Sequence, residues 1–286
     1  MRLQIGGTTG LLGVFGCPVR HSLSPAMHNA AIADLGLDLV YVPFAVEPQS
    51  LGTALRALPN LGVRGVNLTI PHKEAAVPFI DDLDGVARML GAVNTVRVDG
   101  ERLVGTNTDG EGFAVPLRDA GFECRGSSAV VLGAGGAARA VVRQLVDDGA
   151  RVTVVNRSAE RALGLVAAVA GGRAEVVPAA DAHRVQATVL AADLLVNTTP
   201  VGMSTHSPDE LPVPAEWLRR STFVYDLVYR PALTPLLLAA EAMGCVTLGG
   251  LGMLVHQGVA AFRFWTGLMP RPAVMLDAAL AQMDGG

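Results

Sequence analysis

The positions of hydrophobic and polar residues predict strands and helices that alternate along the chain. Short apolar segments have the length of buried strands, and the amphipathic segments between them have the length of helices. The predicted strands cover residues 11–15, 39–46, 63–70, 128–132, 151–155, 175–177, 193–196, 223–227 and 245–248. The predicted helices cover residues 26–35, 48–58, 81–90, 112–121, 137–148, 182–191, 235–243 and 272–282, with a further helix that ends at Phe264. This order is typical of an α/β fold built from βαβ units.

One pair of segments instead predicts an antiparallel hairpin. Residues 92–98 and 102–104 are mostly apolar, and Asp99-Gly100 between them is typical of a tight turn. Asn94 lies in the first arm, and a polar loop that contains Asp109 follows the second arm. Since Asp before Gly is also ordinary turn chemistry, the position of Asp109 alone does not decide between a turn and a functional carboxylate.

A glycine-rich loop follows the predicted strand 128–132. The sequence Gly133-Ala134-Gly135-Gly136-Ala137 continues into the predicted helix 137–148, and the next predicted strand is 151–155. Glycines between a strand and a helix allow backbone N–H groups to approach a pyrophosphate, whose charge then faces the helix N-terminus. The order of strand, loop and helix therefore predicts a dinucleotide-binding site.

The end of the following strand favours NADP over NAD. An NAD site would place a carboxylate there to accept hydrogen bonds from the ribose, but this chain has Asn156-Arg157-Ser158, with Arg161 one turn later. Two guanidinium groups suit a 2′-phosphate. Either arginine alone is also compatible with an ordinary surface position, and Glu160 between them tempers the charge.

Composition narrows the function classes. Half of the 286 residues are hydrophobic and the net charge is −4 without a basic cluster, which argues against a nucleic-acid partner. The apolar runs are far shorter than a membrane span, and the N-terminus lacks signal-peptide features, so we expect a cytoplasmic protein. The cysteines at 17, 124 and 245 have no paired spacing, and the histidines show no metal-ligand spacing, so no metal is predicted.

Lys73 is the only lysine, since 21 of the 22 basic residues are arginine. It follows the predicted strand 63–70, where the sequence passes through Pro71. An arginine cannot release its proton at working pH, whereas a lysine ammonium can pass a proton to a reacting group. Survival by chance is the alternative explanation, but a titratable amine at a strand end indicates catalysis, with Asp109 as its carboxylate partner.

A second polar cluster lies between the first predicted strand and the first predicted helix. Ser24 before Pro25 has the sequence of a helix N-cap, and that role alone would explain it. Ser22 is not needed for the cap. Two hydroxyl groups beside His21 in one loop therefore suggest that this loop binds a small polar ligand.

Taken together, these motifs resemble the shikimate dehydrogenase family over nearly the whole chain. The matching segments are 21–25, 67–73, 91–95, 107–110, 133–137, 156–158, 197–200, 225–229 and 250–257. Ser158 and Leu227 stand where the family usually has Thr and Met.

The resemblance implies an N-terminal α/β substrate domain (residues 1–111 and 253–286), a Rossmann-type NADP domain (112–252) and an active site in the interdomain cleft. It implies reversible NADPH-dependent reduction of 3-dehydroshikimate to shikimate by a monomer or homodimer. Lys73 and Asp109 would be catalytic, and the residues holding the substrate would be Ser22, Ser24, Thr69, Asn94, Tyr229 and Gln257. The residues holding NADP would be Gly133, Ala134, Gly135, Gly136, Ala137, Asn156, Arg157, Arg161, Thr199, Leu227 and Gly250.

Three alternatives remain open at this stage. A relative acting on quinate or aminoshikimate would usually employ NAD, which Arg157 and Arg161 disfavour. A folate-type methylene dehydrogenase also pairs a lysine-bearing domain with a Rossmann domain, but the Ser22-Leu23-Ser24 loop argues against it. A non-catalytic paralogue that binds NADP or the ligand would have no reason to keep both Lys73 and Asp109.

Overall fold

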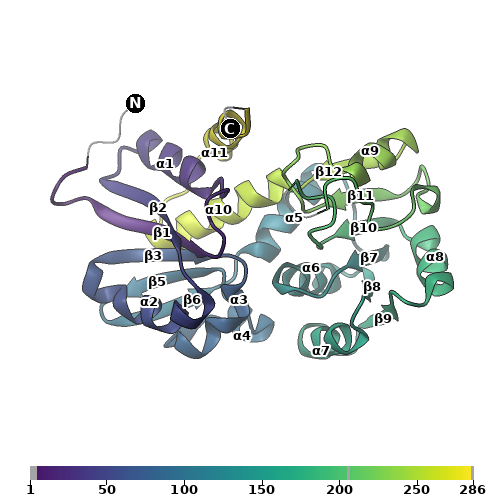
Figure 1. Cartoon of the computed structure of the whole chain (residues 1–286), viewed down its shortest axis with the longest axis horizontal. Coiled ribbons are helices and arrows are strands. Elements are labelled where there is room, and N and C mark those ends of the chain that lie inside the picture. The colour runs from purple at the N-terminus through teal and green to yellow at the C-terminus, as the bar shows by residue number, and fades with distance from the viewer. Residues whose placement is uncertain (1–4, 205–206, 285–286) are drawn as a thin grey trace. The chain divides into compact units, whose positions relative to one another are not determined.

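The computed structural model describes residues 5–204 and 207–284, and it divides into two compact units (Figure 1). The first unit contains the chain up to Thr108 and returns at Val255, and the second contains residues 109–254. Each unit is built on one six-stranded sheet, which confirms the predicted α/β class.

The first unit has a mixed sheet with the strand order β2-β1-β3-β5-β6-β4. Its strands are β1 (Gly10–Gly16), β2 (Leu39–Ala45), β3 (Val63–Leu68), β4 (Asp82–Leu83), β5 (Thr95–Asp99) and β6 (Arg102–Thr106). Its helices are α1 (Ser24–Asp34), α2 (Leu51–Ala57), α3 (His72–Ala75), α4 (Gly85–Leu90), most of α10 (Leu251–Thr266) and α11 (Pro272–Asp284). β1 pairs in parallel with β2 and β3, whereas β5 is antiparallel to both β3 and β6. The predicted hairpin at Asp99-Gly100 is thus confirmed.

Two local predictions in this unit were wrong. Residues 81–90 do not form one helix, because 82–83 pair with β6 as a short strand and α4 begins only at Gly85. The Asp84 carboxylate accepts a hydrogen bond from the backbone N–H of Ala87 and so caps α4. The second error concerns Ser24, which is the first residue of α1 instead of its cap; Leu23 occupies the cap position, and no side chain bonds there.

The sheet of the first unit is covered on both faces. One core cluster joins β3 and β6 to α2, and it includes Leu55, Val66 and Leu103. α1 packs against β1 and β2, and α11 lies beside α1 (Figure 1). Burial on both faces explains why these strands are nearly continuous runs of apolar residues.

The second unit is a fully parallel sheet with the order β12-β11-β10-β7-β8-β9. Its strands are β7 (Ser128–Leu132), β8 (Arg151–Asn156), β9 (Ala174–Pro178), β10 (Leu194–Asn197), β11 (Phe223–Asp226) and β12 (Val246–Gly249). Its helices are α5 (Asp109–Asp119), α6 (Gly136–Asp147), α7 (Ala159–Val169), α8 (Ala182–Ala191) and α9 (Pro235–Ala242). The strand order runs outward in both directions from β7, as in a doubly wound Rossmann-type sheet.

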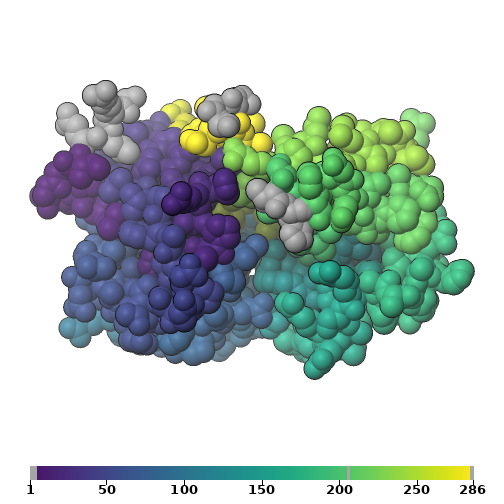
Figure 2. Space-filling model, in the orientation of Figure 1, coloured from purple at the N-terminus to yellow at the C-terminus, as the bar shows by residue number. Residues whose placement is uncertain are grey.

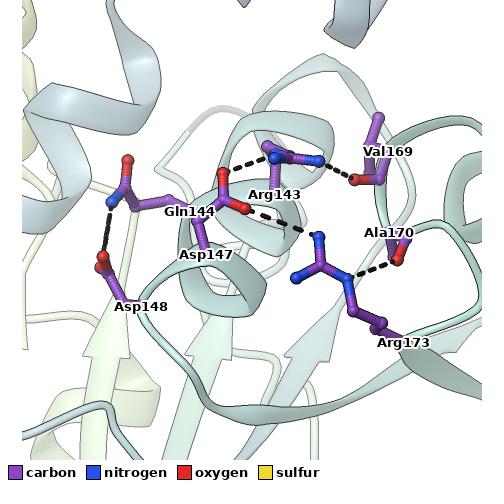
Figure 3. A network of polar contacts seen from close by, with 7 residues as sticks. All are labelled: Arg143, Gln144, Asp147, Asp148, Val169, Ala170 and Arg173. Carbon is purple, nitrogen blue, oxygen red and sulfur yellow. Dashed lines mark hydrogen bonds and ion pairs between the residues drawn. The ribbon is translucent and has the colours of Figure 1, made fainter.

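Ion pairs and hydrogen bonds connect the C-terminal ends of helices α6 and α7 (Figure 3). The carboxylate of Asp147 forms ion pairs with Arg143 and Arg173, at 2.6 and 3.6 Å. The same arginines donate hydrogen bonds to the carbonyl groups of Val169 and Ala170, both at 3.3 Å. These contacts satisfy carbonyl groups that the end of α7 leaves without helical partners. They hold α6, which carries the glycine-rich loop at its start, against α7.

Within the two described ranges, no helix is both long and apolar enough to cross a bilayer. The same residues contain no group of three or more histidine, cysteine or acidic side chains arranged to hold a metal ion.

Candidate active site

In the first unit, three predicted substrate residues lie after the carboxyl ends of β1 and β3: Ser22, Ser24 and Thr69. The loop after β1 bends so that the backbone N–H of Ser22 donates to the carbonyl of Val19, at 3.1 Å. The Ser22 hydroxyl then accepts from the backbone N–H of Ser24, at 3.3 Å. Ser24 is buried, its hydroxyl lies beside the phenol of Tyr41, and it does not cap α1. Ser22 and Ser24 therefore form one local hydrogen-bonded group.

Thr69 and Lys73 follow the end of β3. The backbone N–H of Thr69 donates to the carbonyl of Phe15 in β1, at 2.9 Å, and the Thr69 carbonyl accepts from His72 at 2.8 Å. This turn starts the short helix α3, whose second residue is Lys73. The Lys73 carbonyl accepts from the backbone N–H of Val93, at 2.8 Å. The only lysine is therefore held next to the segment that carries Asn94.

Asn94 is 1% exposed and is oriented by its neighbours. Its Oδ1 accepts from the backbone N–H of Thr108 at 2.9 Å, and its Nδ2 donates to the Thr108 hydroxyl, also at 2.9 Å. That hydroxyl donates to the carbonyl of Gln257 in α10, at 3.0 Å. The structure thus brings Asn94 and Gln257 together through Thr108.

Asp109 is the first residue of the second unit and of α5. It is 2% exposed, and a carboxylate in the first turn of a helix interacts favourably with the helix dipole. The predicted catalytic pair is therefore divided between units, with Lys73 in the first and Asp109 in the second. Tyr229, also in the second unit, is partly buried, and this burial raises the pKa of its phenol, so the group is neutral at physiological pH.

The glycine-rich loop of the second unit leaves the N-terminus of α6 without a side-chain cap. Gly133 has a φ of +109°, and a Cβ added there would lie 2.5 Å from the Thr198 hydroxyl, so only glycine fits. Gly135 is the N-cap residue of α6, where no side chain forms a cap. A Cβ added at Gly135 would meet no other atom within 4 Å. The first turn of α6 also contains no acidic residue. The positive end of this helix is therefore available to an anion.

The end of β8 carries the predicted 2′-phosphate residues. Asn156 donates from Nδ2 to the carbonyl of Ser158 at 2.9 Å, and the Ser158 hydroxyl caps α7 by accepting from the backbone N–H of Arg161. Arg157 and Arg161 are both exposed. Helix α7 lies on the surface of its unit, in teal (Figure 2). Two guanidinium groups are thus displayed at the start of one helix, beside the glycine-rich loop of the neighbouring strand.

The carboxylate of Asp226 connects the ends of β10 and β11. The sequence motifs did not predict this structural role. Asp226 is fully buried and accepts from Asn197 Nδ2 at 2.9 Å and from the Thr234 hydroxyl at 2.6 Å. Burial is the main cause that raises the pKa of this carboxyl group. Asn197 Oδ1 in turn accepts from the backbone and the hydroxyl of Thr199, at 3.0 and 2.6 Å. Asp226 therefore fixes the loop that holds Thr199.

Leu227 and Gly250 approach each other closely. The backbone N–H of Leu227 donates to the carbonyl of Asn197, at 2.9 Å. A Cβ added to Gly250 would lie 2.5 Å from the carbonyl carbon of Leu227, so no side chain fits there. The predicted residues Thr199, Leu227 and Gly250 consequently lie on adjacent strand ends of one sheet, at β10, β11 and β12.

Three family profiles match the chain. The shikimate dehydrogenase substrate binding domain matches residues 14–96, shikimate / quinate 5-dehydrogenase matches 118–204, and the shikimate 5′-dehydrogenase C-terminal domain matches 250–280. A shikimate dehydrogenase (NADP(+)) of Moorella thermoacetica is 46% identical over 289 residues, which cover 99% of this chain and 96% of that relative. The chain belongs to the shikimate dehydrogenase family.

Solved structures of the family share the fold closely. Shikimate 5-dehydrogenase from Thermus thermophilus, in complex with NADP(H) and shikimate, has a TM-score of 0.87 and 42% identity, covering 96% of this chain and 99% of that one. Quinate dehydrogenase from Corynebacterium glutamicum, in complex with NAD, has a TM-score of 0.88 and 35% identity, with the same coverage. The same fold is therefore found in a shikimate dehydrogenase with NADP(H) and in a quinate dehydrogenase with NAD.

Proposed function

We propose that this chain catalyses the reversible reduction of 3-dehydroshikimate to shikimate with NADPH. The observation that carries the proposal is the local geometry of Lys73, which is held at the end of β3 in the same unit as Ser24, Thr69, Asn94 and Gln257. Relatives about 46% identical over nearly the full length are NADP-dependent shikimate dehydrogenases, and this supports both substrate and cofactor.

The roles in binding follow from the chemistry of the side chains. We assign Ser22 and Ser24 to the substrate carboxylate, because their hydroxyl groups can donate to it. Thr69, Asn94 and Gln257 suit the ring hydroxyl groups, since each can both donate and accept. Tyr229, whose raised pKa keeps the phenol protonated, is assigned to close over the carboxylate as a donor.

The second unit is assigned to NADP. The N-terminus of α6 and the backbone of residues 133–137 suit the pyrophosphate, and Asn156, Arg157 and Arg161 suit the adenosine ribose and its 2′-phosphate. Thr199, Leu227 and Gly250 are assigned to the nicotinamide end. When bound, NADP supplies the hydride chemistry, and the protein has to orient the two reactants and to manage one proton and one charge.

We assign Lys73 and Asp109 to the proton transfer and to the charge that develops during hydride transfer. The Lys73 ammonium stabilises the negative charge that develops on the reacting oxygen during reduction and donates a proton to it. Asp109 orients Lys73 and the substrate hydroxyl. We therefore assign the acid–base step to Lys73 and Asp109 together.

A quinate dehydrogenase that employs NAD is the second candidate, since such an enzyme shares 35% identity and the fold. Arg157 and Arg161 argue against it, because no carboxylate stands at the end of β8 to bind an unphosphorylated ribose.

Initial rates of oxidation distinguish the two candidates. The purified protein is assayed with shikimate or quinate, each with NADP or NAD, by the absorbance of the reduced nicotinamide. We expect kcat/KM for shikimate with NADP to exceed that with NAD by about 10²-fold or more, which corresponds to roughly two charge-assisted hydrogen bonds to the 2′-phosphate. We expect it also to exceed both values with quinate. A higher value with quinate or with NAD would overturn the corresponding part of the proposal.

A further inference from the structure

A buried chain of hydrogen bonds runs through the first unit from Tyr41 to Gln257, and its first members have no role so far. The Ser24 hydroxyl lies beside the Tyr41 phenol. Tyr41 donates to Asn67 Oδ1 at 2.7 Å. Asn67 Nδ2 donates to the Thr95 hydroxyl at 3.0 Å, which donates to Asn94 Oδ1 at 2.9 Å. From Asn94 the chain continues through Thr108 to the carbonyl of Gln257. It therefore connects two residues assigned to the substrate, and a third, Ser24, lies beside its first member.

The direction of each bond is set by backbone groups. Asn67 Nδ2 also donates to the carbonyl of Asn94, at 3.1 Å, so the amide cannot turn over and its Oδ1 must face Tyr41. Tyr41 has one hydroxyl hydrogen, which Asn67 Oδ1 receives. The Ser24 hydroxyl beside it can therefore approach the phenol oxygen only as a donor. Burial raises the pKa of Tyr41 well above its usual value, so the phenol keeps its hydrogen at any working pH.

The far end of the chain is fixed in the same way. The backbone N–H of Thr108 donates to Asn94 Oδ1 and so fixes the positions of the Oδ1 and Nδ2 atoms of Asn94. The Thr108 hydroxyl donates to a backbone carbonyl and therefore accepts from Asn94 Nδ2. Six groups, from Tyr41 to the Gln257 carbonyl, thus adopt one donor–acceptor order, and a break at any point leaves a buried polar atom unpaired, which is costly.

Tyr41 itself is held on all sides. Its side chain is 1% exposed and stacks on the ring of His28, with centroids 4.4 Å apart and planes at 17°. His28 is uncharged at neutral pH, because burial lowers its pKa to about 3. The Asn29 side chain bonds both the N–H and the carbonyl of Tyr41, each at 2.8 Å. Since Ser24, His28 and Asn29 all belong to α1, this helix is tied to β2 through Tyr41.

We propose that Tyr41 is a positioning residue of the substrate site, which holds Ser24 and, through Asn67, Asn94 in their binding orientations before the substrate arrives. The inference rests on the proposed function, because it takes Ser24 and Asn94 as substrate residues. Side chains that are already ordered lose less conformational entropy when the ligand binds. A carboxylate is a stronger hydrogen-bond acceptor than a phenol. The Ser24 hydroxyl therefore turns from Tyr41 to the substrate carboxylate when the substrate binds.

Tyr41→Phe tests the proposal, because it removes one oxygen and keeps the ring stacked on His28. We expect KM for shikimate to rise about three- to tenfold, which corresponds to the ordering cost of one or two side chains, with kcat and KM for NADP changed less than twofold. Tyr225→Phe is the matched control: Tyr225 is also fully buried and stacked, on Phe113 at 5.1 Å, but its hydroxyl has no hydrogen-bond partner among the described residues. This control should change none of the three constants.

The double variant Ser24→Ala/Tyr41→Phe separates positioning from a general loss of structure. If Tyr41 acts largely through Ser24, its loss raises KM for shikimate less than twofold once Ser24 is already alanine. Equal effects of Tyr41→Phe in both backgrounds, or an unchanged KM in the single variant, would overturn the proposal. Calorimetric titration with shikimate repeats the comparison without turnover: weaker binding only in the variant supports the inference, and equal binding refutes it. A wild-type protein that does not turn over shikimate would refute the proposed function separately.

Discussion

Lys73→Ala is expected to lower kcat for shikimate oxidation by about 10²- to 10⁴-fold, the usual contribution of a positioned acid–base group. KM should change far less, because the ammonium is assigned to a charge that develops mainly in the transition state. The backbone of Lys73 holds Val93 through its carbonyl, and alanine preserves that bond, so the fold of the neighbouring segment should persist. The measurement is steady-state kinetics with both substrates varied.

Lys73→Arg is the matched variant, since it keeps the positive charge but cannot release its proton at working pH. We expect its kcat to stay within about tenfold of the alanine variant if proton transfer is the main task of Lys73. Recovery to near wild-type activity in the arginine variant would show that charge alone suffices. Near-normal kcat in Lys73→Ala would contradict the assignment of Lys73 altogether.

Arg157→Ala is expected to raise KM for NADP by about 10- to 100-fold, because a charge-assisted hydrogen bond contributes roughly 1.5–3 kcal/mol. KM for NAD should hardly change, since NAD has no 2′-phosphate, so the preference for NADP should fall by the same factor. The test is kinetics with each cofactor at saturating shikimate. Arg161→Ala should act in the same direction.

The control for these variants is Arg184→Ala. Arg184 is exposed on α8 of the same unit, so its removal changes the net charge equally without touching the end of β8. A similar rise in KM for NADP in this control would mean that the effect is long-range charge, and it would contradict a specific phosphate contact by Arg157.

Much of the fold could be predicted from the sequence because its signals are local. The glycine-rich loop between β7 and α6 and the hairpin turn at Asp99-Gly100 each depend on a few neighbouring residues, and both are found. The predicted strand 193–196 likewise corresponds to β10 within one residue.

The errors arose where distant residues override local preference. Ser24 before Pro25 has the sequence of a cap, yet it lies inside α1 with its hydroxyl beside Tyr41, a residue of the neighbouring strand β2. Asp81 to Asp84 resemble a helix start, but β6 offers 82–83 a strand partner.

Tyr41 and Asn67 were not found as members of the site for a related reason. A tyrosine in an apolar strand is typical of a core residue, and only the pairing of β2 and β3 with β1 reveals its neighbours. Asn67 lies in a recognised motif, but its bonds to Tyr41 and Thr95 span 26 and 28 positions of the chain. Such hydrogen bonds depend on the assembled sheet, so no local pattern predicts them.

The central claim is that this chain transfers hydride between NADPH and the ring carbonyl of 3-dehydroshikimate. Mass spectrometry of the product tests it most directly, after incubation of the protein with 3-dehydroshikimate and NADPH that carries deuterium at both C4 positions. The account predicts shikimate that contains one deuterium on the carbon bearing the new hydroxyl group. Unlabelled shikimate, or no shikimate while NADPH still binds, would contradict it.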